Sequence, residues 1–246
     1  MKVIAFIPAR YQSSRFPGKP LALIAGKPMI RHVYERAVSS PGLSGVYVVT
    51  DDERIFDAVS GFGGEAVMTG TEYRSGTDRI GEAARIMGLR TEDIVLNIQG
   101  DQPIFHVSHI SRLLEPFQED RSILMTTLKY RIADDDEIND PNHVKVVTDS
   151  RGFGLYFSRS TIPFYRGNPS DTVTYKHLGF YGYRMDFLTR FTRLSTGVLE
   201  SAEKLEQLRA LEHGFRIKVV ETPFDSVEVD VPTDVKKVEE LLAAEG

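Results

Sequence analysis

The sequence predicts an α/β protein whose central sheet is mostly parallel, with helices on both faces and one antiparallel excursion. Two observations lead to this fold class. Over the first 120 residues, short apolar runs alternate with stretches of helical spacing, as in parallel strands joined by helical crossovers. From about residue 120 to residue 190, strand-like runs follow one another without long helices between them. We therefore expect a single domain over residues 1–246, in which residues 120–190 form an antiparallel lid or dimerisation lobe.

Composition narrows the class of protein. The 246 residues carry a formal net charge of −5 and include no cysteine, so disulfides and cysteine-ligated zinc are excluded. No apolar run reaches the length needed to span a membrane, and the first strand begins almost at Met1, which leaves no room for a signal peptide. We expect a cytoplasmic globular protein that binds neither membranes nor, with its pI of ≈ 5.7, nucleic acids.

The first strand and the loop after it are the most informative stretch. Val3–Ile7 is short, β-branched and aromatic, which predicts a buried strand that Pro8 ends. Prolines and a glycine keep the next residues irregular, and this loop carries Arg10, Arg15 and Lys19. Ligands of open α/β sheets bind at the carboxyl ends of the strands. Three cations there, in an acidic protein, predict an anion site, and a nucleoside triphosphate is the natural candidate.

Two familiar phosphate loops do not fit this stretch. A P-loop requires a glycine and a serine or threonine where this chain has Ser13 and Pro20. The dinucleotide fingerprint requires three closely spaced glycines, and only Gly18 is available. A basic surface loop without a ligand is the alternative interpretation.

The elements of the first half follow from apolar spacing and from their end signals. Ile30, Val33 and Ala37 share one side of a helix, and Asp51 or Asp52 can cap the helix after the second strand. The expected helices span 28–40, the segment from Asp52 to the Gly61–Gly64 stretch, the segment that Ser75 begins, and 107–117. The expected strands span 46–50, 65–68 and 94–98, the last of them central because it is uniformly apolar.

The second half is richer in strands. We expect strands over 124–130, 144–148, 154–158, 177–183 and 216–221, and helices over 185–193, over 203–213 up to Gly214, and from Pro232 onward. Leu205, Leu208 and Leu211 are the predicted buried stripe of the helix over 203–213.

Two carboxylates occupy matching positions after strands. Asp101 follows the apolar run IVLNIQ and Gly100, whose missing side chain lets a ligand approach, and Asp230 follows the strand-like 227–229. Mg²⁺ usually takes one or two protein carboxylates together with phosphate oxygens and water. The pair therefore suits Mg²⁺ shared with a triphosphate. The alternative roles are a turn residue for Asp101 and a helix-entry residue for Asp230.

Two further segments offer polar groups to a ligand. Ser75 and Asp78 have the spacing of a helix start, where free N–H groups can bind a base or an anion. In a strand over 177–183, His177 and Tyr181 share one face beside a glycine, and the opposite face is apolar. Such a polar, aromatic face could hold a sugar, or it could be the half-exposed side of an ordinary strand.

The chain resembles a known family over essentially its whole length. IPARYQSSRFPGKPL at 7–21 resembles the opening of the cytidylyltransferases that couple 3-deoxy-manno-octulosonate (Kdo) to CMP, whose pattern is close to IPARxxSxRxPGKPL. Six further motifs occur in that family's order: SGTDR (75–79), NIQGDQP (97–103), YFSRSTIP (156–163), HLGFYGYR (177–184), LEQLR (205–209) and VEVDVPTD (227–234). The resemblance implies a Rossmann-like nucleotide-diphospho-sugar transferase fold.

The resemblance also implies an activity, the transfer of CMP from CTP to the anomeric hydroxyl of Kdo with release of pyrophosphate, which activates the sugar for lipopolysaccharide synthesis. It implies Mg²⁺ at Asp101 and Asp230, catalytic roles for Lys19 and Arg10, and a homodimer. The implied nucleotide contacts are Ala9, Arg10, Arg15, Lys19, Ser75, Arg79 and Gln99, and the implied sugar contacts are Gln99, Arg159, His177, Tyr181, Glu206 and Gln207.

The chain departs from the family pattern at a few positions. The family more often has His and Gln where Tyr73 and Arg74 stand, so base contacts from these two positions are left open. It commonly has QGDEP where Gln102 gives QGDQP, and often NAVKV where this chain has NHVKV at 142–146. Both changes resemble a branch that acts on 8-amino-3,8-dideoxy-manno-octulosonate. We expect Kdo as the substrate, with the 8-amino sugar as the alternative.

Two other classes of protein are weighed against this interpretation. A sialic-acid or sugar-1-phosphate nucleotidylyltransferase is disfavoured by the joint presence of HLGFYGYR and LEQLR. A non-catalytic nucleotide-binding regulator on the same fold would have lost Lys19, Asp101 or Asp230, and all three are present.

Overall fold

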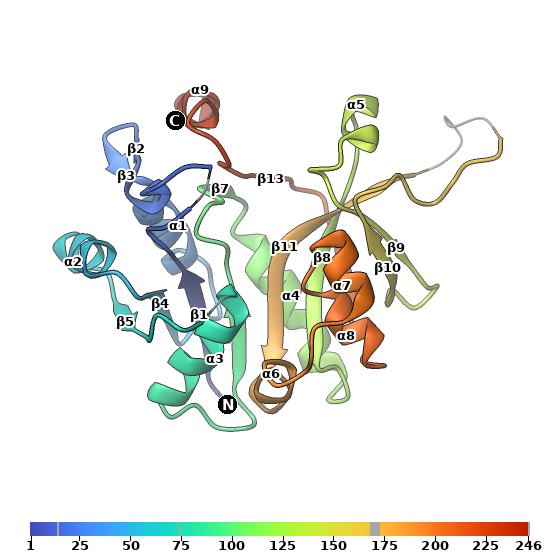
Figure 1. Ribbon diagram of the computed structural model, residues 1–246, viewed down its shortest axis with the longest axis horizontal. Coiled ribbons are helices and arrows are strands. Elements are labelled where there is room, and N and C mark those ends of the chain that lie inside the picture. The colour runs from blue at the N-terminus through green and yellow to red at the C-terminus, as the bar shows by residue number, and fades with distance from the viewer. Residues whose placement is uncertain (14, 74, 168–172, 246) are drawn as a thin grey trace.

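The computed structural model describes residues 1–13, 15–73, 75–167 and 173–245 (Figure 1). Its helices are the 3₁₀ turn η1 (Lys19–Leu21), α1 (Met29–Val38), α2 (Glu53–Gly61), α3 (Gly76–Ile86), α4 (Ser108–Glu119), α5 (Asp135–Asn139), α6 (Met185–Phe191), α7 (Val198–Glu203), α8 (Leu208–Glu212) and α9 (Asp234–Glu245). Its strands are β1 (Val3–Pro8), β2 (Leu23–Ile24), β3 (Lys27–Pro28), β4 (Gly45–Thr50), β5 (Ala66–Met68), β6 (Ile94–Asn97), β7 (Ile104–Phe105), β8 (Met125–Arg131), β9 (Lys145–Thr148), β10 (Gly154–Ser158), β11 (Tyr175–Arg184), β12 (Lys218–Thr222) and β13 (Ser226–Val227).

Most of the described strands join one nine-stranded sheet. Its main path runs β10–β9–β11–β6–β1–β4–β5, and β8 pairs with both β11 and β12. β1 is parallel to β4 and β6, β4 is parallel to β5, and β8 is parallel to β12. β11 is antiparallel to β6, β8 and β9, and β9 is antiparallel to β10. The predicted fold class, an α/β sheet with an antiparallel excursion, is confirmed.

Alternation along β1 explains why helices cover both faces of the sheet. Ala5 and Ile7 join one core with residues of α1, α2 and α4, whereas Ile4 and Phe6 join a second core with residues of α3, α6 and α8. Figure 1 shows the parallel N-terminal half and the strand-rich C-terminal half side by side. Among the described helices, none combines the length and the apolar character that crossing a membrane requires.

The helix predicted over 203–213 is wrong. α7 ends at Glu203, Lys204 adopts a left-handed conformation with φ 55°, and α8 begins only at Leu208. The interruption has a tertiary cause, because Arg159 Nε donates to the carbonyl of Glu203 at 2.9 Å, an oxygen that a continuing helix would need for its own ladder. The apolar spacing alone could not reveal a partner from a distant strand.

The end of the chain returns to the sheet through a short strand pair. β13 lies antiparallel to β7, and the N–H of Val229 donates to the carbonyl of Asp101 at 2.9 Å. The terminal helix begins at Asp234 instead of Pro232, and the Asp234 carboxylate accepts the N–H groups of Asp230 and Val231. These contacts, which no local pattern predicts, hold residues 228–230 against the turn after β6.

Gly100 sits where that turn passes the end of β1. A Cβ at this position would lie 2.7 Å from the carbonyl oxygen of Pro8, a contact that backbone atoms cannot relieve without moving. The absence of a side chain thus lets Asp101 lie beside the loop that carries Lys19.

We predict that Gly100→Ala lowers the free energy of unfolding by about 1–3 kcal/mol, because the new methyl group overpacks a site closed by backbone. Urea denaturation measures this loss. Gly61→Ala is the matched control, since nothing lies within 4 Å of a Cβ there, and it should be neutral or slightly stabilising. Equal stability of both variants would contradict the close approach at Gly100.

Candidate active site

The candidate site lies at the carboxyl ends of β1 and β6, where the loop after β1 meets the turn after β6. Lys19 begins η1 in that loop, and Asp101 lies in the turn. Asp230 arrives from the other end of the chain through the β7–β13 pair. The structure therefore brings together three of the four residues with an expected catalytic role, and the fourth, Arg10, contacts the segment before α3 instead.

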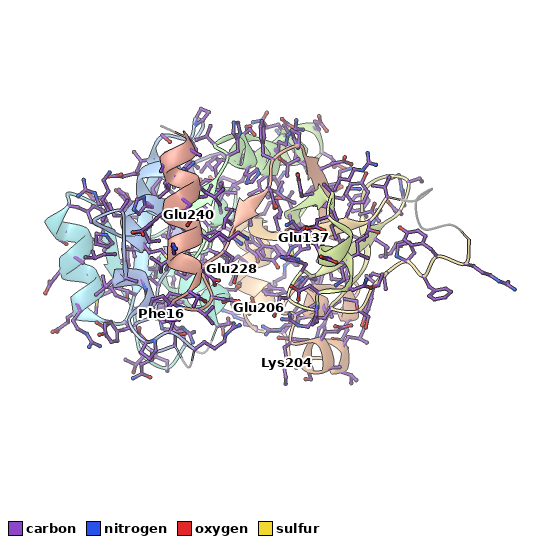
Figure 2. All side chains as sticks on the ribbon, turned by 90° about the horizontal axis from the view of Figure 1, so that it is seen from above. Phe16, Glu137, Lys204, Glu206, Glu228 and Glu240 are labelled. Carbon is purple, nitrogen blue, oxygen red and sulfur yellow. The ribbon has the colours of Figure 1, made fainter. Side chains whose placement is uncertain are left out.

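Three carboxylates gather at this point. One carboxylate oxygen from each of Asp101, Glu228 and Asp230 lies within 4.8 Å of the others. Sequence reasoning missed Glu228, although the alternation in VEVD places it and Asp230 on the same side of an extended segment. In the view from above, Glu228 lies in the middle of the molecule, as does Glu206 (Figure 2).

Two cations of the loop pair with these carboxylates. Lys19 Nζ lies 2.7 Å from Asp101 Oδ2 and 3.7 Å from Asp230 Oδ1, and it also donates to the carbonyl of Val229 at 2.9 Å. Arg15 Nη1 lies 3.1 Å from Asp230 Oδ2, with its side chain 61% exposed. Lys19 is thus a half-buried link between the two carboxylates, whereas Arg15 pairs with Asp230 from an exposed position.

Glu228 is the electrostatically unfavourable member of the cluster. Desolvation of its carboxyl group and the negative charges of Asp101 and Asp230, against the opposing effect of Lys19, together raise its pKa to about 8. The residue as a whole is exposed, so the desolvation concerns the carboxyl end that faces the other two acids. Oxygen donors of this kind, crowded and only partly neutralised, fit a hard divalent cation such as Mg²⁺.

The start of α3 is the second part of the candidate site. Ser75 is its N-cap and accepts the N–H of Asp78 at 3.0 Å, as predicted for a helix start. Arg10 reaches this wall, because its Nη2 donates to the carbonyl of Tyr73 at 2.7 Å. The expectation about base contacts from Arg74 lies outside the described residues. This hydrogen bond joins the loop after β1 to the segment before α3, where the nucleotide contacts are predicted.

The structure places two of the predicted nucleotide residues inside the protein. Arg79 is fully buried, with Nη2 2.7 Å from Asp51 Oδ2 and Nη1 2.7 Å from Thr69 Oγ1. Ala9 is also buried, and its N–H donates to the carbonyl of Val49 at 2.9 Å. Arg79 fixes the loops around the site to one another, which is the role of a positioning residue.

β11 presents the predicted polar and aromatic face. Gln99 Nε2 donates to the carbonyl of Gly179 at 3.0 Å, and the rings of His177 and Tyr181 lie 5.4 Å apart. Thr127 Oγ1 donates to a backbone carbonyl of β11 at 2.7 Å, so it accepts from His177 Nε2 at 2.9 Å. This assignment leaves His177 Nδ1 as an acceptor.

Burial keeps this face uncharged. It lowers the pKa of His177 to about 3, and it also raises the pKa of Tyr181, an effect to which the nearby Glu206 adds. Both groups are therefore neutral at physiological pH, and they offer hydrogen bonds without charge.

The turn between α7 and α8 lies near this face of β11, because Glu206 in the turn acts electrostatically on Tyr181. Glu206 accepts a short hydrogen bond from Thr77 Oγ1, and burial raises the pKa of its carboxyl group. Its Oε1 and the Nε2 of Gln207 are buried without hydrogen-bond partners. A bidentate contact from Arg209 to Glu200, at 2.8 and 2.5 Å, holds the turn. Glu206 Oε1 still lies 3.6 Å from Arg209 Nη2 in an ion pair, so Gln207 Nε2 is the polar atom of these two predicted sugar residues that is buried without either kind of contact.

Arg159 lies at the end of β10, where its guanidinium is already engaged. Nε donates to the carbonyl of Glu203 and Nη1 to the carbonyl of Pro141, each at 2.9 Å. The Glu203 carboxylate accepts from Ser158 Oγ and from the N–H of Arg159. The two carbonyls that hold the Arg159 guanidinium are neutral, so these contacts do not compensate its positive charge.

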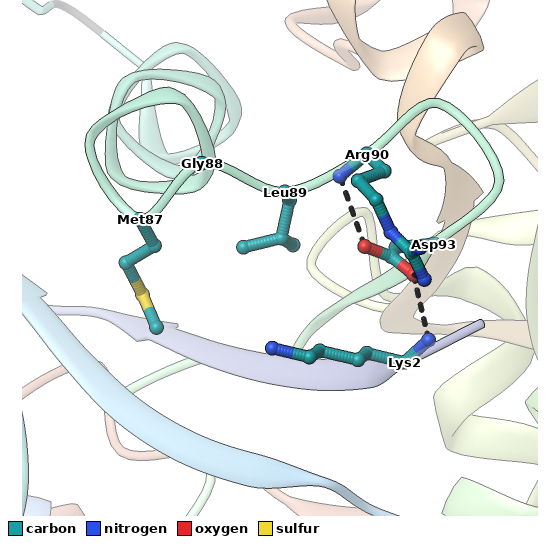
Figure 3. Close-up of a pocket in the computed structure, with 6 residues that line it drawn as sticks. All are labelled: Lys2, Met87, Gly88, Leu89, Arg90 and Asp93. Carbon is teal, nitrogen blue, oxygen red and sulfur yellow. Dashed lines mark hydrogen bonds and ion pairs between the residues drawn. The ribbon is translucent and has the colours of Figure 1, made fainter.

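Two hollows flank the sheet. A hollow of about 360 Å³ lies between the start of β1 and the loop after α3, lined by Lys2, Met87, Gly88, Leu89, Arg90 and Asp93 (Figure 3). It lies at the amino ends of the strands, away from the carboxylate cluster. A hollow of about 540 Å³ lies beside the loop of Arg15 and Lys19, lined by Tyr11, Gln12, Ser13, Pro17 and Arg54.

Comparisons with known proteins agree with this geometry. A family model described as cytidylyltransferase matches residues 4–219. The chain is 55% identical over 242 residues to a 3-deoxy-manno-octulosonate cytidylyltransferase of Desulfatibacillum aliphaticivorans, covering 98% of this chain and 99% of that one. It is 53% identical over 246 residues to an 8-amino-3,8-dideoxy-manno-octulosonate cytidylyltransferase of Shewanella sp. (strain ANA-3), with both chains covered completely.

Solved structures extend the comparison. The fold matches that of a CMP:2-keto-3-deoxy-manno-octonic acid synthetase complexed with CTP, with a TM-score of 0.94, 42% identity and full coverage of both chains. A 4-diphosphocytidyl-2C-methyl-D-erythritol synthase matches with a TM-score of 0.65, 16% identity and coverage of 98% and 100% of the two chains, a likeness of fold alone.

Proposed function

Because the chain belongs to the cytidylyltransferase family, we propose that it transfers CMP from CTP to the anomeric hydroxyl of Kdo and releases pyrophosphate. The observation that carries the proposal is the meeting of Lys19, Asp101 and Asp230 at one point of this fold. The full-length likeness to a Kdo cytidylyltransferase names the acceptor sugar. The product would activate the sugar for lipopolysaccharide synthesis, and we place the reaction in the cytoplasm.

The reaction is a direct displacement. The anomeric oxygen of the sugar forms a bond to the α-phosphorus, and the bond from that phosphorus to the oxygen that bridges it to the β-phosphorus breaks. Pyrophosphate leaves with that oxygen, and the hydroxyl proton passes to solvent water. No covalent intermediate on the protein is required, so positioning and charge neutralisation supply most of the rate. Arg10, Arg15 and Lys19 would hold the triphosphate, and the N-cap region at Ser75 would face the nucleotide.

Mg²⁺ is the proposed cofactor. Asp101 and Asp230 would hold it, and Glu228 offers a third oxygen donor within 4.8 Å. The bound ion supplies a Lewis acid that draws charge away from phosphate oxygens. Lys19 would then move from the carboxylates toward the triphosphate, because the metal would engage Asp101 and Asp230, its two carboxylate partners.

The sugar would lie between β11 and the turn before α8. Gln99, His177 and Tyr181 line the strand side. On the turn side, Gln207 offers a buried Nε2 without a hydrogen-bond partner, and Glu206 offers its Oε1, which lies 3.6 Å from Arg209 Nη2. Arg159, whose charge meets only neutral carbonyls at its guanidinium contacts, is the proposed partner of the sugar carboxylate.

The 8-amino-3,8-dideoxy sugar is the second candidate acceptor. It is favoured by QGDQP at 99–103 and by the likeness to the Shewanella relative over the whole chain. The two sugars differ only in the substituent on their eighth carbon, so the displacement and its residues are the same for both.

We also propose that the 120–190 lobe forms a homodimer. It exposes large apolar side chains, with Phe164 89% exposed, Leu155 62% and Val173 40%. Apolar residues gathered on one lobe favour association with another protein surface.

We predict that pyrophosphate release with CTP and Mg²⁺ requires an octulosonate. Kdo, its 8-amino analogue and a sialic acid are compared side by side, and turnover confined to one octulosonate identifies the sugar. Binding of CTP without turnover on any of the three would instead indicate a nucleotide-binding regulator.

Asp101→Asn should lower the turnover number by about 100-fold or more, because an isosteric amide removes the charge that faces the reacting phosphates. Asp57→Asn, on the exposed side of α2, is the matched control and should leave turnover unchanged. Calorimetric titration of Mg²⁺ into the protein–CTP complex should show weakened binding for Asp101→Asn only. Most of the activity persisting at saturating Mg²⁺ would contradict the metal assignment.

Light scattering should give a mass about twice the 27.6 kDa of one chain. Phe164→Asp should shift the protein toward the monomer by placing a charge in the apolar contact. Leu23→Asp, at a position 61% exposed outside the lobe, should leave the mass unchanged. A monomer for the unaltered chain would rule out the dimer.

A further inference from the structure

Gln102 is buried without the hydrogen bonds that a buried amide requires. The residue is only 6% exposed, and its side-chain Oε1 has no hydrogen-bond partner. A carboxamide oxygen normally accepts up to two hydrogen bonds, and leaving it dry and unpaired inside a protein is unfavourable. An unpaired buried oxygen of this kind calls for an explanation, and a role in accepting a hydrogen bond from a ligand is one.

The position of Gln102 points to the sugar side of the proposed site. It follows Asp101 directly, and its backbone N–H donates to the carbonyl of Gln99 at 3.3 Å in the turn after β6. A Cβ placed on Gly179 would lie 3.7 Å from Gln102 Nε2 and 3.5 Å from Gln99 Cγ. Both amides thus cover the glycine that separates His177 from Tyr181.

The two amides differ in how they are held. Gln99 Nε2 donates to the carbonyl of Gly179 at 3.0 Å and to Asn97 Oδ1 at 3.4 Å, so the strand anchors it. Gln102 Oε1 has no comparable anchor. The turn before α8 shows the same feature at Gln207, whose buried Nε2 has no hydrogen-bond partner. Buried polar atoms without hydrogen bonds, in the turn after β6 and in the turn before α8, are complementary to a polyhydroxylated ligand.

We infer that Gln102 is a specificity-determining sugar contact, whose Oε1 accepts a hydrogen bond from a hydroxyl or amine of the octulosonate. This inference rests on the proposed function. A lone acceptor selects a ligand that can donate at that point, because any other group would leave the amide unpaired. The donor is either a hydroxyl that both candidate sugars share or the substituent on the eighth carbon, where they differ.

Gln102→Met tests the inference, since it keeps the unbranched shape and removes the acceptor. The KM for the sugar should rise about 10-fold or more, as expected for one lost buried hydrogen bond, while the KM for CTP stays unchanged. The melting temperature should stay the same or rise, because an unpaired buried polar group is removed. A structural role would instead lower the melting temperature and leave the sugar KM unaltered.

Two further variants sharpen the test. Gln102→Glu keeps an acceptor oxygen and should restore the sugar KM to within a few-fold of the original. Gln118→Met makes the same exchange at an exposed position of α4 and should change neither KM. A loss that is equal for Kdo and its 8-amino analogue identifies a shared hydroxyl as the donor, and a loss confined to one sugar identifies the eighth-carbon substituent.

The outcome is separable from the proposed function. Turnover of the unaltered chain on either octulosonate establishes the reaction first, and an unchanged sugar KM in Gln102→Met then overturns the inference alone. If the unaltered chain shows no turnover, equilibrium titration of each sugar into the original protein and into Gln102→Met still measures the contact. Equal affinities of the two proteins would overturn it.

Discussion

The backbone hydrogen bond from Val229 to Asp101 ties the end of the chain to its middle, and the candidate site depends on it. Without this 2.9 Å contact and the short β7–β13 pair, Asp230 would have no fixed position relative to Asp101. Lys19 strengthens the junction, because its ammonium group meets the Asp101 carboxylate and the Val229 carbonyl together. Three segments that are distant in sequence thus form one rigid corner at the carboxyl ends of the central strands.

The site divides its charge into two regions. Around Asp101 and Asp230, ionised groups of both signs lie within ion-pair distance, as suits a metal and a triphosphate. Along β11 and the turn before α8, burial holds His177 neutral and raises the pKa of Glu206. A sugar acid would therefore meet mainly neutral hydrogen-bonding groups, with Arg159 as its cationic partner.

Local patterns predicted the strands of the main sheet and the longer helices, because β-branched runs, caps and glycines act over a few residues. They did not predict short elements such as β2, β3, β7 and α5. They also located Lys19, Asp101 and Asp230, since each follows or opens a recognisable element. The end of the helix before Lys204 and the position of Glu228 beside Asp101 depend on residues that are distant in the sequence. Local spacing therefore could not predict them. The same holds for Gln207 and for the Oε1 of Glu206, which are buried by tertiary packing.

In the free protein, the loop cations and the carboxylates serve as counter-ions for one another. Lys19 and Arg15, which would bind phosphates, are already paired with Asp101 and Asp230, which would bind the metal. A nucleotide that bound alone would have to separate Lys19 from Asp101, and a metal that bound alone would have to displace the same ammonium group. With both ligands bound, the ammonium group would pair with the phosphates and the two carboxylates with the metal. The two ligands would therefore bind synergistically by thermodynamic linkage, and each would lower the concentration at which the other saturates.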